Sequence, residues 1–162
     1  MRPICKIIFL NCVLALTLSS VTQAEEIKTP PDITSPELAR IKSLEGRWSA
    51  TTSMFGKPNE VVYTEYEVTA GGSAVLERIF PGTPHEMMSV YYDDNGKLAM
   101  THYCIMRNRP TLKLTKSDGD TIVMEVKKVD GLKSKGNPSM GDLTIRIKDE
   151  NHMEQTCSGK GE

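Results

Sequence analysis

The chain is poor in aromatic side chains, with one Trp, three Phe and five Tyr among 162 residues. Aromatic rings bury more apolar area than any other side chains and dominate the packing of filled cores. Nine Met residues stand among the remaining apolar side chains. The resulting core is thin for a solid β structure, and this indicates an internal cavity.

The chain also lacks an apolar run of about 20 residues, the length that spans a bilayer. The most apolar stretch, Ile7 to Leu18, follows the basic residues Arg2 and Lys6 and precedes the small-residue sequence Thr22–Ala24. This order is typical of an export signal. We therefore expect residues 1–24 to be removed near Ala24 and the protein to be periplasmic or secreted, without a membrane span.

A basic cluster is absent as well. Beyond residue 24 the chain contains 18 Lys and Arg residues and 21 Asp and Glu residues, and charges of both signs alternate along it. Nucleic-acid binding requires a concentration of positive charge on one face. The sequence therefore predicts no nucleic-acid partner, and it leaves the oligomeric state open.

Only two of the four cysteines, Cys104 and Cys157, lie beyond the export signal. No C-x-x-C pair occurs, so neither a zinc site nor dithiol chemistry is indicated. In an oxidising compartment Cys104 and Cys157 are a candidate disulfide. The alternative is two separate thiols that behave as small apolar side chains.

A short leader at residues 25–34 is expected to precede one domain at residues 35–162. The domain begins with helix signals: Thr34 or Ser35 as the cap, and Pro36 at the first helical position. Three apolar residues, Leu38, Ile41 and Leu44, form a single stripe along this helix.

Beyond Trp48 the pattern is typical of β structure, with short runs of β-forming residues separated by Gly, Pro, Asn and Asp turns. The expected strands are Trp48–Ser53, Val61–Thr69, Ser73–Phe80, Glu86–Tyr92, Lys97–Cys104, Thr111–Lys116, Thr121–Val129, Leu143–Lys148 and His152–Cys157. Connections this short require antiparallel neighbours. The sequence therefore predicts an all-β fold, an antiparallel up-and-down β-barrel of eight to ten strands, which encloses side chains or one small ligand.

Four segments carry a family resemblance. Gly46–Trp48 shows the G-x-W pattern of lipocalins and other calycin barrels, and Ala70–Glu77, Glu86–Tyr91 and Thr101–Cys104 follow in order. Together they resemble small exported bacterial proteins of unassigned function related to DUF1579 lipocalin-like domains, over roughly residues 38 to 157. The resemblance implies a calycin-like barrel and no known activity. The final strand departs from the pattern because it lacks an aromatic residue.

The stretch from Pro84 to Cys104 is predicted to form a β-hairpin around the turn Asp93–Gly96, since Asn-Gly is the strongest short hairpin signal. In its second strand Leu98, Met100, His102 and Cys104 alternate with more polar residues, so we expect this set to face the interior. In its first strand Met88 alternates with Ser89, and this pattern alone does not show which of the two faces the interior.

An interior His beside Met and Cys is compatible with haem ligation, but no second ligand or attachment motif is present. A nucleophilic pair of Cys104 and His102 lacks an orienting carboxylate. We therefore assign no catalytic residue, no metal site and no cofactor. A hydrolase or isomerase that uses His102 with Glu77 or Cys104 remains an alternative, as do a haem-binding barrel and a solid structural or interaction module.

The leading hypothesis is a non-enzymatic protein that binds a small, mostly apolar molecule inside the barrel. The expected contacts are Met100, His102, Met88 and Tyr66. Glu77 interrupts an apolar strand, and a buried charge at this position needs a partner or a polar ligand group. An ion pair of Glu77 or its neighbour Arg78 with Arg107 or Glu65 is the alternative.

Overall fold

The computed structural model describes residues 33–52, 60–134 and 136–160. It consists of one helix, one 3₁₀ turn (Ala70–Gly72) and nine strands. The helix is α1 (Pro36–Lys42), and the strands are β1 (Gly46–Thr52), β2 (Glu60–Thr69), β3 (Ala74–Ile79), β4 (Met87–Asp94), β5 (Lys97–Tyr103), β6 (Arg109–Asp118), β7 (Thr121–Asp130), β8 (Ser139–Ile147) and β9 (Met153–Lys160). The predicted export signal and most of the predicted leader lie outside the described residues.

All nine strands form a single sheet in sequence order, and each is antiparallel to the next. The turn between β4 and β5 shows how local sequence sets this order. Asn95 and Gly96 have positive φ angles of 54° and 75°, and Asp94 pairs with Lys97 across them. This is the two-residue turn that matches the twist of a hairpin. The predicted meander and hairpin are confirmed.

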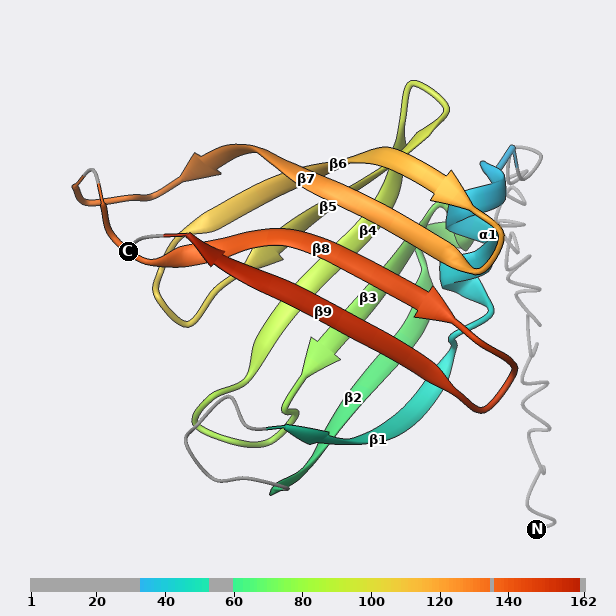
Figure 1. The fold of residues 1–162 in the computed structure, drawn as a ribbon, viewed down its shortest axis with the longest axis horizontal. Coiled ribbons are helices and arrows are strands. Elements are labelled where there is room, and N and C mark those ends of the chain that lie inside the picture. Colours follow the sequence, from blue (N-terminus) through green and yellow to red (C-terminus); the bar gives the residue numbers. More distant parts are fainter. Residues whose placement is uncertain (1–32, 53–59, 135, 161–162) are drawn as a thin grey trace, which may run out of the picture.

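The sheet curls strongly, so that β8 and β9 come to lie opposite β2 and β3 (Figure 1). Among the described residues, however, β1 pairs only with β2 and β9 only with β8. The structure is therefore a curled half-barrel, and the predicted closed barrel is wrong in this respect. Side chains, rather than backbone hydrogen bonds, bridge the interior beside β9.

Helix α1 covers one end of the curled sheet (Figure 1). Ser35 caps it by accepting a hydrogen bond from the Leu38 amide at 3.1 Å, and the Ser35 hydroxyl donates to Asp93 of β4 at 2.6 Å. Leu38, Ile41 and Leu44 are fully buried against the inner face of the sheet. The predicted helix is confirmed with Leu38 and Ile41 on its buried side, but it ends at Lys42, so Leu44 packs from the turn that follows.

The apolar core fills the inner face near α1. Its strand residues are almost wholly inaccessible to solvent: Val75, Leu98, Met100, Leu112, Ile122, Met124, Leu143 and Ile145. They come from β3 and from β5 to β8, so the core depends on the curl of the whole sheet. The polar side chains of the inner face lie farther along the strands, away from the helix.

A close backbone approach fixes the pairing of the last two strands. The sheet register shifts between Met140 and Leu143, where Gly141 packs against Ser158 of β9. A Cβ atom at Gly141 would lie 2.5 Å from the Ser158 carbonyl oxygen. Only glycine therefore fits at this position without a displacement of β9.

Gly141→Ala is expected to lower the free energy of unfolding by about 2 kcal/mol, because the added methyl group forces the two backbones apart. Denaturant unfolding measures the change. Gly159→Ala, on the neighbouring strand, is the matched control, because a Cβ there meets no atom within 4 Å. Equal stability of the two variants would contradict the close approach.

Candidate functional site

The inner face carries a row of polar side chains across four adjacent strands. In the sheet register Tyr66 pairs with Glu77, Glu77 with Ser89, and Ser89 with His102. Partners that lie directly opposite in antiparallel strands point to the same face of the sheet. All four side chains are at most 3% exposed. A polar row this deeply buried is the main departure from an apolar core.

Glu77 is the centre of this row and accepts three hydrogen bonds. The Tyr66 hydroxyl donates to Oε1 at 2.8 Å, and the Tyr91 hydroxyl donates to Oε2 at 2.9 Å. The third donor is the Gln155 side chain of β9, whose Nε2 lies 3.2 Å from Oε1. No described Lys, Arg or His forms an ion pair with Glu77. Hydrogen-bond donors alone therefore compensate the buried carboxyl group.

The carboxyl group also changes the acidity of the tyrosines that hold it. The pKa values of Tyr66 and Tyr91 are raised well above the usual value, first by burial and then by the adjacent Glu77. Both phenols therefore stay protonated at physiological pH and act as donors. Burial of a carboxyl group without a cation is costly, and such groups are concentrated at functional sites.

His102 occupies the end of the row and is bonded to Ser89. Its Nδ1 lies 3.0 Å from the Ser89 hydroxyl oxygen. Burial lowers the pKa of His102 to about 4. The imidazole is therefore neutral at physiological pH, and its pairing with a hydroxyl group fits the neutral form.

This geometry does not assemble the predicted catalytic alternative. Among the described residues, no hydrogen bond joins His102 to Glu77 or to Cys104. Glu77 is bonded to tyrosines, and His102 is bonded to Ser89, so the two groups belong to separate pairs. No group of three or more His, Cys, Asp and Glu side chains in the described chain is placed to hold a metal ion.

The predicted contact residues lie on two different faces. Tyr66, Glu77, Met100 and His102 are buried on the inner face, as expected. Met88 is 37% exposed and pairs with Tyr103 and Arg78 on the outer face. The expectation that Met88 contacts a ligand beside the other four is therefore corrected.

The predicted disulfide and the predicted ion pair have different outcomes. Cys104 is half-buried just beyond β5, Cys157 is exposed on β9, and both are free thiols. The structure thus contains the unbridged alternative. Arg78 points outward and forms ion pairs with Glu86 and Glu65. The alternative that named Glu65 as an ion-pair partner therefore applies to Arg78 and not to Glu77.

Sequence reasoning missed three residues of the site: Ser89, Tyr91 and Gln155. A signal for the first two was present. A two-residue turn at Asn95-Gly96 pairs Asp94 with Lys97 and therefore Ser89 with His102. Once His102 is placed inside, Ser89 and Tyr91 must face inward as well. Gln155 had no such signal, because its contact with Glu77 joins residues 78 positions apart.

The fold and site define a curled antiparallel half-barrel with a buried carboxyl group on its concave face. No protein-family model, curated protein or solved structure matches this chain. Across the part of the chain that the structure describes, no helix combines the length and apolarity needed to cross a bilayer.

Proposed function

We propose that this protein is an exported, non-enzymatic binding protein with a lipocalin-like half-barrel, which holds a small, mostly apolar molecule on its concave face. The signal-like first 24 residues support export. The helix that covers one end of a curled antiparallel meander supports the lipocalin-like assignment. The buried Glu77 cluster supports a specific polar contact within an otherwise apolar site.

The observation that carries this proposal is a difference among the three hydrogen-bond donors of Glu77. Two of its donors, Tyr66 and Tyr91, are buried on interior strands of the sheet. The third donor, Gln155, belongs to the edge strand β9 and makes the longest of the three hydrogen bonds, at 3.2 Å. A ligand with one N–H or O–H donor replaces Gln155 and leaves the tyrosine pair intact. The carboxyl group thus selects a donor-bearing ligand.

The concave face is exposed to solvent beside β1, four positions along β2 from Tyr66. In the register of β1 and β2, Ala50 pairs with Val62 and Trp48 pairs with Thr64. Val62 and Thr64 lie four and two positions before Tyr66 on β2, so both pairs point to the same face as Tyr66. Ala50 is exposed and Val62 is only half-buried, although both point inward. The interior is therefore open to solvent beside β1, where β9 does not complete the sheet.

Native mass spectrometry of the protein purified from its own host tests the proposal. We expect a small organic molecule to be retained by the wild-type protein and lost from Glu77→Gln, which replaces one acceptor oxygen of the carboxyl group with an NH₂ donor. Glu67→Gln is the matched control because Glu67 is exposed on the opposite face of β2. Gln155→Leu is expected to retain the ligand, since the ligand supplies the donor itself. Absence of any bound molecule, or equal retention by Glu77→Gln, would refute the proposal.

A further inference from the structure

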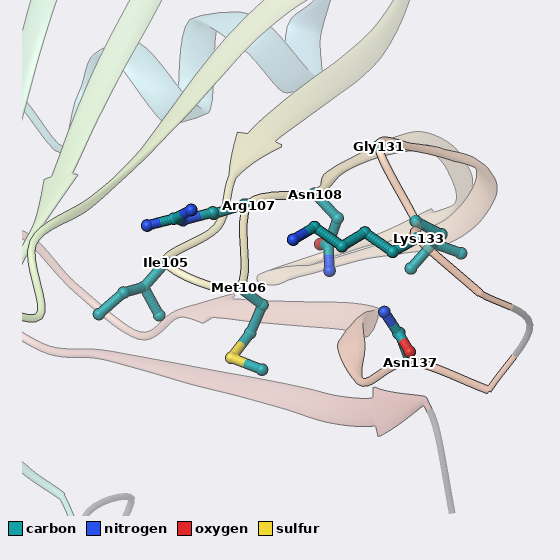
Figure 2. A pocket seen from close by; sticks show the side chains of 8 residues that line it. Ile105, Met106, Arg107, Asn108, Gly131, Lys133 and Asn137 are labelled. Carbon is teal, nitrogen blue, oxygen red and sulfur yellow. The ribbon is translucent and has the colours of Figure 1, made fainter.

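A hollow lies on the surface, away from Glu77. It has a volume of about 300 Å³ and lies between the β5–β6 turn and the β7–β8 connection. Figure 2 shows the Lys133 side chain extending from the connection toward Arg107 and Asn108 of the turn, with the Asn137 amide on the same side. The two sides of the hollow thus present polar groups to one another.

Asn108 has an unusual hydrogen-bonding state in this hollow. Its side chain is 2% exposed, and its Nδ2 donates to the Pro138 carbonyl oxygen at 2.9 Å. Its Oδ1 is the one buried side-chain oxygen or nitrogen in the described chain without a hydrogen-bond partner. The bond to Pro138 fixes the orientation of the amide, because the reversed amide would place two acceptors together. A buried acceptor of this kind calls for a donor from outside the protein.

The hollow also carries positive charge that the protein itself does not neutralise. Neither Arg107 nor Lys133 has an ion-pair partner among the described carboxylates. The adjacent Asp130 is engaged by Lys128 at 2.9 Å. Asn137 accepts a hydrogen bond from Ser134 through Oδ1, which leaves its Nδ2 free to donate. Two cations and one amide donor therefore line the same hollow as the unpaired acceptor.

The backbone holds the two sides of this hollow together. Arg107 has a φ of 63°, a conformation that long side chains rarely adopt. Gly131 packs so closely that a Cβ atom there would lie 2.9 Å from the Arg107 carbonyl oxygen. Strained residues of this kind concentrate at sites that bind ligands. The hollow is thus built by a specific contact rather than by two loose loops.

We propose that this hollow binds a hydroxylated organic anion of the sugar-acid class. The anionic group lies between Arg107 and Lys133, and a hydroxyl group donates to Asn108 Oδ1. Three apolar side chains at the hollow, Ile105, Met106 and Leu132, are exposed to 44%, 53% and 38%. They suit the C–H face of a sugar ring. This site is independent of the ligand proposed for the concave face.

Titration of the purified protein with three probes, followed by amide NMR shifts, tests this inference. Glucuronate supplies both charge and hydroxyl groups, glucose only the hydroxyl groups, and acetate only the charge. We expect saturable shifts at residues 105–108, 131–133 and 137 with glucuronate, and binding at least about tenfold weaker with the other two. Equal binding of acetate, or no binding of glucuronate, would overturn the inference.

Lys133→Gln tests the contribution of this positive charge to binding. Lys133 is exposed, so its replacement removes the charge without disturbing the core. The affinity of this variant for glucuronate is expected to fall about tenfold. Lys97→Gln, at the opposite end of β5, is the control and should bind as the wild type does. An unchanged affinity in Lys133→Gln would also count against the site.

Discussion

Removal of both tyrosine hydroxyl groups from Glu77 is expected to lower the free energy of unfolding by about 4 kcal/mol. A buried acceptor that loses its partner costs about 1–3 kcal/mol, and Tyr66→Phe/Tyr91→Phe removes two donors from one fully buried carboxyl group. The phenylalanine rings keep nearly the same shape, so little cavity forms. Urea denaturation at pH 7 measures the effect, and Tyr103→Phe, on the outer face of β5, should change stability by less than about 0.5 kcal/mol.

The origin of this loss can be separated from a simple packing defect. If an unsatisfied carboxyl group causes the loss, adding Glu77→Leu to the double variant should recover part of it, because replacing all polar partners with apolar groups of similar size costs little. If packing causes the loss, the triple variant should be no more stable than the double variant. A double variant as stable as the wild type would show that Glu77 does not depend on the tyrosines.

Acidification is expected to destabilise the protein through His102 by about 3 kcal/mol in total. The folded pKa of about 4 lies below the ordinary histidine value of 6.5, so the unfolded chain binds the proton more readily. The stabilisation is fully present above about pH 6.5 and is lost as the pH falls through the folded pKa. We expect roughly 2 kcal/mol of the loss between pH 7 and pH 5.

Chemical denaturation at several pH values measures the free energy of unfolding, and the slope of this free energy against pH is the readout. His102→Gln should lose most of the slope between pH 5 and pH 6.5, whatever its stability at pH 7. His85→Gln, which replaces an exposed histidine, should keep the slope. An ordinary titration of the His102 ring near pH 6.5 in NMR spectra of the folded protein would contradict the prediction.

Much of the fold was predictable because its signals are local. The Asn95-Gly96 turn, the Pro36 helix start and the stripe of Leu38, Ile41 and Leu44 each depend on residues only a few positions apart. Short connections left antiparallel pairing as the only arrangement of the strands. The alternation in β5 correctly placed Met100 and His102 inside.

The candidate site was predicted only in part. Tyr66, Glu77 and His102 were named, but Met88 was placed beside them because the alternation of β4 was not combined with the register of the hairpin. The register places Ser89 opposite His102 and sends Met88 outward. An error of one residue moves every side chain of a strand to the opposite face.

The amino-acid sequence by itself specified a strand meander with one capping helix, because turns, caps and alternation act over a few residues. The tertiary structure alone decided that the meander stops short of closure and that β9 brings Gln155 to Glu77 from 78 residues away. It alone also decided that the β7–β8 connection meets the turn at Arg107. These contacts depend on the accumulated twist and curl of nine strands, a property that no short segment of sequence contains.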